Sequence, residues 1–409
     1  MTNDVRMRGF ARRHTVEAAL AMLDPHLLPL DAEHVALQEA SGRVLADDVV
    51  SGVDVPGFER ATMDGFAVVA ASTEGAASYT PLPLDVVGDS LPARPFDGSV
   101  AAGDAVRIMT GAPLPHGSDA VLPAEWVDGA PGSSRIAALA AVSPGQNVGR
   151  CGEDIARGTT VLGRGRTLRP QDLGVLSSIG VNQVRVVRRP RVRLVVTGNE
   201  LLPAGSAPHG YSIADANGPM LTALAERDGA MVDFPGLVSD ERDAILQALT
   251  ADAHIVIVSG GSSVGVEDLA PTLLAAHGEL WVHGIAMRPS SPTGFGRIGR
   301  RLVFLLPGNP VSCLCGYDFF AGRAVRALGG RAKEWPYRSI AATLDRKISS
   351  QIGRLDYARV RVAAGRVEPL AIGGASVLSS TTRADGFVVV PADSEGFGPG
   401  TEVTVWLYA

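Results

Sequence analysis

The chain has 409 residues, of which 46% are hydrophobic and 20% are charged, and its formal net charge is −6. This composition is typical of a folded protein and excludes a largely disordered chain, while the length exceeds one ordinary core and predicts two to four domains. The acidic balance argues against nonspecific binding to nucleic acid, which requires a basic surface.

The sequence also bears on the compartment. It has no apolar run approaching the roughly 18 residues of a membrane-spanning helix, and its first residues lack the apolar region of a signal peptide. The three cysteines do not form a disulfide framework. We therefore expect a cytoplasmic protein without membrane contact. Cys313 and Cys315 are candidates for a metal pair, but residues two apart on a helix point to different faces, which favours buried thiols.

The first half of the chain mixes helical and β-rich segments. Residues 15–23 have the spacing of a short amphipathic helix, with Thr15 as its N-cap. Residues 52–144 contain short β-like runs separated by glycine and proline, which predicts a small β-rich domain inserted into another domain. The flanking segments are expected to be extended over 35–50, and to form strands at 161–162 and 184–187 around a helix at 170–179.

From residue 191 the pattern becomes regular, because strands alternate with helices, and this predicts a parallel, doubly wound α/β sheet. The expected strands are 192–196, 230–234, 255–258, 279–287 and 302–306. The expected helices begin near Pro219, follow Ser239-Asp240, and cover 269–276 and 311–328. Residues 331–409 lack long helical periodicity and predict a small C-terminal β barrel or sandwich.

Three glycine-rich strings each follow an expected strand: 197–200, 259–265 and 307–310. In an open α/β sheet, ligands bind at the carboxyl ends of the strands, and glycine lets backbone N–H groups approach an anion closely. The sequence therefore predicts a site for a phosphorylated or oxyanionic ligand. Its candidate binding residues are Gly260, Gly261, Ser262, Ser263, Gly265, Pro307 and Pro310.

Three acids, Glu200, Asp240 and Asp268, follow successive strands and are expected to face this same crevice. Asp240 has an alternative role as a helix N-cap, and Asp268 as an ordinary first-turn acid. Acids beside an anion-binding loop repel a phosphate unless a divalent cation lies between them, and Mg²⁺ takes one or two carboxylates plus phosphate oxygens. The constellation thus predicts Mg²⁺-assisted chemistry at a pyrophosphate or similar group.

Two arginines are candidates for binding the oxyanion. Arg288 ends the expected strand 279–287 and should point into the crevice, and Arg297 lies nearby. The planar guanidinium of either could donate two parallel hydrogen bonds to an oxyanion. Each has the alternative of being an ordinary surface arginine.

Several strings taken in order resemble the MoeA/gephyrin E-domain family, the molybdopterin molybdenumtransferases, over nearly the whole chain. They are PGFERATMDGFAV (56–68), RIMTGAPLPHGSDAVLPAE (107–125), GRCGEDIARGTTVL (149–162), TGNEL (197–201), SGGSSVGVEDL (259–269) and LPGNPVS (306–312). The resemblance implies insertion of molybdenum from molybdate into adenylylated molybdopterin, with Mg²⁺ assisting and AMP released. It also implies a homodimer, with a site formed between subunits, and leaves interaction with the molybdopterin adenylyltransferase open.

The resemblance implies a multidomain α/β fold. An elongated linker domain would comprise 1–51 and 145–190, with the β-rich domain inserted at 52–144. A central MogA-like, doubly wound α/β domain would cover 191–330 and a C-terminal β barrel domain 331–409. The family's functional acids fall on Asp64, Asp154, Glu200, Asp240 and Asp268, its threonine on Thr110, and C-terminal residues on Arg354 and Ser376.

The chain departs from the family in its cations. Members usually have Lys-Pro-Gly-Lys-Pro where this chain has Arg288-Pro289-Ser290-Ser291-Pro292, and a further lysine aligns with Gly284. The resemblance therefore implies a less cationic substrate site, in which Arg297 is a candidate for compensation. It leaves three hypotheses: a working molybdenumtransferase, a non-catalytic gephyrin-like scaffold, and a family enzyme that handles tungstate or a modified pterin.

Overall fold

The computed structural model describes residues 13–261, 269–371 and 373–408. The chain divides into two compact units. The main unit contains the described residues of 1–33, 42–44 and 185–409, and the second unit contains 34–41 and 45–184. The chain passes between them through β1 (Ala32–Ala36) and β12 (Gln183–Val187). None of the described helices is both long enough and apolar enough to span a membrane.

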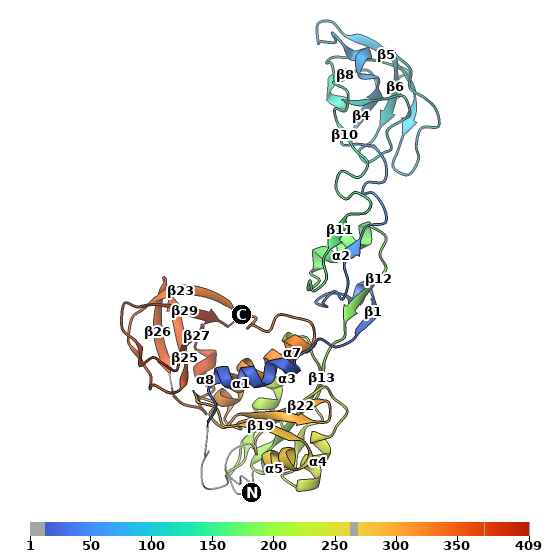
Figure 1. Cartoon of the computed structure of the whole chain (residues 1–409). Coiled ribbons are helices and arrows are strands. Elements are labelled where there is room, and N and C mark those ends of the chain that lie inside the picture. Colours follow the sequence, from blue (N-terminus) through green and yellow to red (C-terminus); the bar gives the residue numbers. More distant parts are fainter. Residues whose placement is uncertain (1–12, 262–268, 372, 409) are drawn as a thin grey trace. The chain divides into compact units, whose positions relative to one another are not determined.

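A seven-stranded sheet forms the centre of the main unit (Figure 1). Its path is β16-β13-β18-β22-β21-β19, and β17 also pairs with β13. The strands are β13 (Arg191–Thr197), β16 (Met231–Asp233), β17 (Leu237–Val238), β18 (Ile255–Ser259), β19 (Glu279–His283), β21 (Gly294–Ile298) and β22 (Arg301–Leu306). The first four strands of the path and β17 are parallel, as expected, whereas β21 and β19 extend the sheet in antiparallel fashion.

The expected strand over 279–287 is wrong in its extent. The strand β19 ends at His283, and the chain turns at Gly284, where φ is +98°. A separate strand, β20 (Met287–Arg288), then pairs with the C-terminal sheet instead of the central one. The missed strand β21 joins β22 through a two-residue hairpin whose first residue, Gly299, has a φ of +60°.

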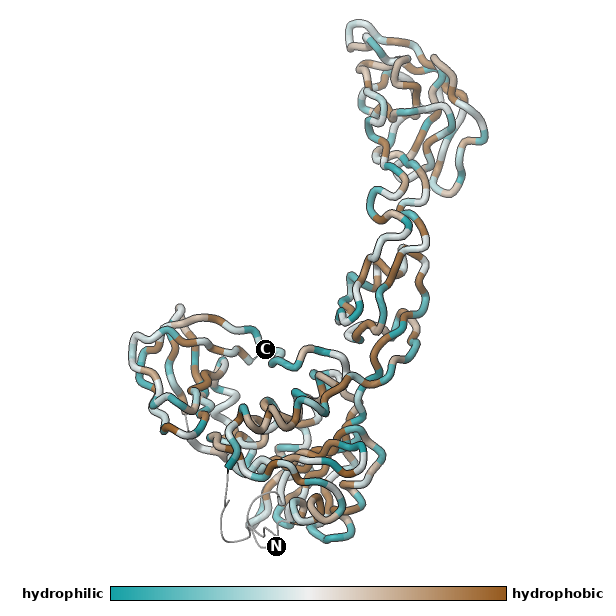
Figure 2. The backbone as a smooth tube through the Cα atoms, in the orientation of Figure 1, coloured by the Kyte–Doolittle hydropathy of each residue, from teal (hydrophilic) through white to brown (hydrophobic). Residues whose placement is uncertain are grey.

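Helices cover both faces of the central sheet. On β18 the alternate residues Ile255 and Ile257 face one core, and Val256 and Val258 face the other. The first core packs against α1 (Val16–Leu23), α3 (Asn217–Arg227), α6 (Pro310–Gly316) and α7 (Gly322–Leu328), and the second against α4 (Arg242–Leu249) and α5 (Ala270–His277). Figure 2 shows the hydrophobic residues concentrated along these strands. The helix predicted at 15–23 is confirmed, with Thr15 capping it through Ala18 N–H.

The helix predicted over 311–328 is interrupted. A π-helical turn at Tyr317–Ala321 separates α6 from α7. Both Cys313 and Cys315 are buried on α6, and burial raises the pKa of Cys313 to about 12. A metal ligand has to be a thiolate, so this environment supports the buried-thiol interpretation. The described residues contain no group of three or more His, Cys, Asp or Glu side chains that could hold a metal ion.

The C-terminal strands close into a small barrel. Strand β25 (Leu355–Ala363) pairs with β26 (Arg366–Ala371) on one side and with β27 (Gly386–Val390) on the other, and β23 (Arg338–Leu344) and β29 (Glu402–Leu407) complete the ring. This pairing decides between the two expected alternatives in favour of a barrel. Three short elements decorate it: β24 (Ile348–Ser349), β28 (Gly396–Phe397) and α8 (Ser379–Thr382).

The second unit contains a six-stranded sheet in the order β7-β4-β6-β5-β9-β8. Its strands are β4 (Gly65–Val68), β5 (Leu82–Ser90), β6 (Asp104–Ile108), β7 (Ala120–Pro123), β8 (Val127–Asp128) and β9 (Arg135–Ala138). Two-stranded pairs join β3 (Arg60–Ala61) to β10 (Val148–Gly149) and β2 (Val49–Val50) to β11 (Thr160–Leu162), and the unit also contains α2 (Pro170–Ser178). The β-rich character predicted for residues 52–144 is confirmed, since β3 to β9 all lie within this range.

A buried ionic network joins the helices of the main unit to the segment that leads into the barrel. Asp228 is 1% exposed and accepts hydrogen bonds from Arg326 at 2.7 Å and from the Tyr317 hydroxyl at 3.0 Å. Asp318 is completely buried and accepts the Tyr337 hydroxyl at 2.9 Å. Because buried charges are costly unless they are paired, the network fixes how these elements pack.

We expect the Asp318→Asn substitution to reduce the dependence of stability on pH. Burial raises the pKa of Asp318 to about 7, well above its unfolded value near 4. The stabilising contribution is therefore complete below about pH 4 and is lost as the pH rises towards 7. The asparagine variant should become more stable relative to wild type over this window, as measured by urea unfolding at pH 4.5, 6 and 7.5. An unchanged difference at all three pH values would contradict the prediction.

Candidate functional site

The three predicted loops begin side by side at the carboxyl ends of parallel strands. Val196 of β13 lies opposite Ser259 of β18, which in turn lies opposite Leu306 of β22. The backbone at Gly260 has a φ of +95°, and a Cβ atom there would lie 2.1 Å from the carbonyl oxygen of Thr197. Only glycine fits this position, so the first and second loops pack through their backbones. We call this region the strand-end crevice.

Two of the predicted acids lie at this crevice. The Asp240 carboxylate accepts a hydrogen bond from the hydroxyl of Thr197, the last residue of β13. The alternative role of Asp240 as a helix cap is not observed, since α4 has Glu241 as its N-cap and no side-chain capping bond. Glu200 is exposed and follows β13 by three residues. The predictions for Ser262, Ser263, Gly265 and Asp268 fall outside the described residues.

Sequence reasoning missed two polar residues in the crevice. Asp215, which is 5% exposed, accepts the backbone N–H groups of Asn217 and Gly218, each at 2.9 Å, and so caps the start of α3. The Asn217 amide donates to the Ser259 hydroxyl at 2.8 Å and to the Gly308 carbonyl at 2.7 Å. These bonds hold the loops after β18 and β22 together. The string Asp215-Ala-Asn-Gly-Pro219 before a helix carried the signal, because Asp and Asn are typical of helix starts.

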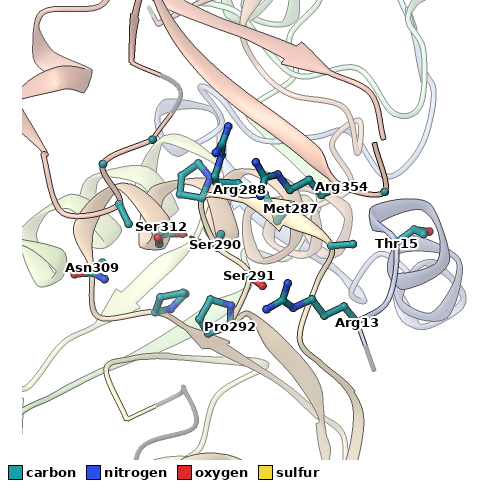
Figure 3. Close-up of a pocket in the computed structure, with 17 residues that line it drawn as sticks. Arg13, Thr15, Met287, Arg288, Ser290, Ser291, Pro292, Asn309, Ser312 and Arg354 are labelled. Carbon is teal, nitrogen blue, oxygen red and sulfur yellow. Dashed lines mark hydrogen bonds between the residues drawn. The ribbon is translucent and has the colours of Figure 1, made fainter. Parts of the chain in front are cut away.

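A pocket of about 590 Å³ lies beside the crevice in the main unit (Figure 3). Its polar lining comprises Arg13, Thr15, Arg288, Ser290, Ser291, Asn309, Ser312 and Arg354. Pro307 also lines it, as predicted for a ligand-binding loop. We call it the arginine pocket, because guanidinium groups are its strongest hydrogen-bond donors toward an anion.

One buried carboxylate orients two of these arginines. Asp356 on β25 is completely buried, and its Oδ2 accepts from Arg288 at 2.7 Å and from Ser350 at 2.9 Å. The Nε of Arg354 lies 3.1 Å from Asp356 Oδ1, an ion pair without hydrogen-bond geometry. Asp356 therefore orients both arginine side chains. The side chains of Arg288 and Arg354 remain 37% and 29% exposed, so part of each stays accessible to a ligand.

The segment after Arg288 is held in an unusual conformation. Ser290 has a φ of +89°, which is rare for residues other than glycine and costs about 1–3 kcal/mol. Its hydroxyl donates to the Ser312 carbonyl at 2.6 Å and shares a hydrogen bond with the Thr293 hydroxyl at 2.7 Å. These bonds hold the turn that places Ser291 in the pocket lining.

The loop 373–375 also lines the arginine pocket. Completely buried Arg359 donates to the Gly373 carbonyl, and Ala375 accepts the backbone N–H of Val311 at 3.0 Å. These bonds tie the loop to the barrel and to α6. Ser376, predicted to bind substrate, follows this loop and is exposed, but it does not belong to the described lining.

Arg297 does not contribute to the arginine pocket. It lies on β21, donates to Glu279 at 2.7 Å, and places its guanidinium 5.8 Å from the Trp281 ring centre. This is the surface alternative, and the expectation that Arg297 binds the oxyanion and compensates for missing lysines is not supported. The remaining predicted residues are near the loops: Gly261 has a φ of +54°, and Pro310 is the first residue of α6.

The second unit contains the other predicted residues. Asp64 accepts both the backbone N–H and the hydroxyl of Thr110, each at 2.7 Å. The backbone hydrogen bond has the larger effect, and together the two bonds hold the pKa of Asp64 below its usual value. Asp154 is exposed, and its backbone N–H donates to the Val55 carbonyl at 3.1 Å. Asp64 and Thr110 therefore form one fixed, charged group on the surface of this unit.

Three family models match the chain. They are described as "MoeA N-terminal region (domain I and II)" over residues 14–180, "Probable molybdopterin binding domain" over residues 193–327, and "MoeA C-terminal region (domain IV)" over residues 341–408. Together they span both units.

Individual proteins are similar over nearly the full length. The chain is 33% identical over 404 residues to the molybdopterin molybdenumtransferase of Haemophilus influenzae, covering 95% of this chain and 97% of that protein. It is 34% identical over 385 residues to molybdopterin molybdenumtransferase 2 of Mycobacterium tuberculosis, covering 91% and 94%. A solved structure of the molybdopterin biosynthesis MoeA protein from Pyrococcus horikoshii has a TM-score of 0.81 at 31% identity, covering 97% of this chain and 100% of that one.

Proposed function

Because this chain belongs to the MoeA family of molybdopterin molybdenumtransferases, we propose that it inserts molybdenum from molybdate into adenylylated molybdopterin and releases AMP. The role in molybdenum cofactor biosynthesis follows from these relatives. The chemistry requires a site for a small oxyanion next to a site for a pyrophosphate, and we assign these roles to the arginine pocket and the strand-end crevice of the main unit.

The observation that carries this proposal is the loop shared by the two sites. Pro307 and Asn309 line the arginine pocket, while the Gly308 carbonyl between them accepts the Asn217 amide in the strand-end crevice. We infer that Arg288 and Arg354 bind molybdate in the pocket, where fixed guanidinium groups need little reorganisation. The backbone of Gly260 and Gly261 would bind the pyrophosphate in the crevice. The two substrates would then meet across one loop.

We propose Mg²⁺ as the metal of the crevice. Glu200 and Asp240 fit it, because both carboxylates belong to the loops after neighbouring parallel strands, and Mg²⁺ needs only one or two carboxylates besides phosphate oxygens. Asp268 is our third proposed ligand. When bound, the ion would neutralise charge on the pyrophosphate as AMP leaves. The hydrogen bond from Thr197 keeps the Asp240 carboxylate directed for this role.

We also propose roles for the remaining predicted residues. Asp64, oriented by Thr110, and Asp154 of the second unit would act at the substrate, and Ser376 of the main unit would bind it. The family further suggests a cytoplasmic homodimer, a division into domains at 1–51 with 145–190, 52–144, 191–330 and 331–409, and the adenylyltransferase as a protein partner. Sedimentation at twice the chain mass of 42.4 kDa would support the dimer.

The test is release of AMP from adenylylated molybdopterin by the purified protein with Mg²⁺. Release that depends on molybdate, together with activation of a molybdenum enzyme, would support the transferase. Release with tungstate alone would indicate a different metal preference. Absence of release with either oxyanion would contradict the proposed activity and favour a scaffold role.

A further inference from the structure

Arg13 enters the arginine pocket from a segment far away in sequence. Its neighbour His14 forms a parallel bridge with Ile285, in which His14 N–H donates to the Gly284 carbonyl at 3.0 Å and Ala286 N–H donates to the His14 carbonyl at 2.7 Å. The next residue, Thr15, caps α1 and also lines the pocket. The backbone of Arg13 is thus fixed by the first residues that follow it.

Helix α1 anchors this segment from the other side. Val16, Ala19 and Leu23 are buried in the main core. Asp24, which follows the helix, accepts two hydrogen bonds from Arg323 of α7, both at 2.7 Å. The residues that follow Arg13 are therefore held by backbone hydrogen bonds, by core packing and by an ion pair. These contacts fix the position from which the Arg13 side chain extends into the pocket.

Three arginines reach the pocket because three short segments lie side by side. The segment 13–15 hydrogen-bonds to 284–286, and Leu355 N–H donates to the Ala286 carbonyl at 2.9 Å. Strand β20 then pairs with β25 in parallel, with Arg288 opposite Asp356. Arg13 is the first residue of the segment 13–15, Arg288 is the last residue of β20, and Arg354 directly precedes β25. Figure 3 shows Arg288 and Arg354 together on one side of the pocket and Arg13 with Ser291 on the other.

The two sides of the pocket differ in their polar groups. Arg288 and Arg354 share the negative charge of Asp356, so an oxyanion meets a partly compensated pair there. On the other side, the Ser291 hydroxyl oxygen is buried and has no hydrogen-bond partner within 13–261, 269–371 and 373–408. A serine is short and uncharged, which leaves room for the longer Arg13 side chain to reach the same space.

We propose that Arg13 is a substrate-binding residue that supplies the cation on the Ser291 side of the arginine pocket. Its ligand is a tetrahedral oxyanion, which is either molybdate or a phosphate group of the pterin substrate. This inference rests on the proposed function of the pocket and adds a residue from outside the segments that resemble the family. The guanidinium binds the oxyanion through paired N–H donors, and the Ser291 hydroxyl donates one more hydrogen bond.

The experiment compares Arg13→Gln, Arg13→Lys and the double variant Arg13→Gln with Ser291→Lys. One arm measures the Kd for molybdate by equilibrium dialysis without pterin, and the other measures KM for the adenylylated pterin and kcat at saturating molybdate. We expect Arg13→Gln to raise one of the two constants about 10- to 100-fold, because a charged hydrogen-bond donor is lost. Arg13→Lys should stay within about tenfold of wild type, and the double variant should recover most of the loss.

The controls separate this inference from structural damage and from the proposed function. Arg297→Gln, in the same unit but outside the pocket lining, should leave both constants unchanged, and circular dichroism checks folding. An Arg13→Gln protein with wild-type Kd and KM would overturn the inference, as would a double variant as weak as Arg13→Gln alone. If wild type binds molybdate through Arg13 but releases no AMP, the proposed function fails and this inference stands.

Discussion

The Asp240→Ala variant is expected to lose at least about 100-fold in kcat for molybdate-dependent AMP release while remaining folded. The change removes one of the two described carboxylates that we propose as Mg²⁺ ligands, and with it charge that would hold the ion beside the pyrophosphate. Because Asp240 caps no helix and is only partly buried, its loss should not unfold α4. The measurement is single-turnover release of AMP at saturating Mg²⁺.

Two further variants define what the Asp240→Ala result means. Thr197→Val removes the hydroxyl that orients the carboxylate but keeps the charge, so it should cost less than Asp240→Ala and raise the Mg²⁺ concentration needed for half-maximal activity. Asp252→Ala removes an acid that is 90% exposed and paired with Arg191 on the surface, and should leave kcat unchanged. Near-wild-type turnover by Asp240→Ala would refute the assignment of a metal site to this crevice.

The Asp228→Ala variant is expected to lose about 3–5 kcal/mol of unfolding free energy, because it leaves a buried cation without its partner. The Arg326 side chain is 3% exposed, and its Nη1 lies 2.7 Å from Asp228 Oδ2. The Tyr317 hydroxyl would also lose its acceptor. Equilibrium unfolding in guanidinium chloride, followed by tryptophan fluorescence, would measure the loss.

The matched control is Asp85→Ala in the second unit. Asp85 also pairs with an arginine, at 2.6 Å, but both side chains are more than half exposed, so water screens the pair and its loss should change the unfolding free energy far less than the loss of Asp228. A comparable loss in both variants would show that burial does not decide the strength of these ion pairs in this protein.

The sequence was sufficient to predict the parts of the structure that depend on neighbouring residues. Alternating strands and helices between 191 and 328 predicted the central sheet, and glycines after three of its strands predicted the loops of the crevice. Thr15 was predictable as a cap because capping depends on neighbouring residues. The resemblance to the family added Asp64 and Thr110, whose hydrogen bonds join residues 46 positions apart.

The arginine pocket could not be predicted from local patterns, because its residues come together through pairing between distant segments. Strand β20 has only two residues, which is too short to show an alternating pattern in the sequence, and its partner β25 begins far away at Leu355. The sequence pattern therefore does not predict this pairing. Strand β21 was missed because Gly294 and Gly296 weaken its β-strand signal. Arg13 lay in no recognised motif, and Arg297 was considered instead because it is closer in sequence to the strand ends.

The pairing of β20 with β25 also sets the order of events during synthesis. The central sheet can form once Leu306 has left the ribosome, since all of its strands precede residue 307. The pocket cannot, because Arg354 and Asp356 come later and the barrel that holds them closes only with β29, which ends at Leu407. A nascent chain therefore has the crevice before it has the arginine pocket, and chains released early by a premature stop codon would lack the proposed site for molybdate.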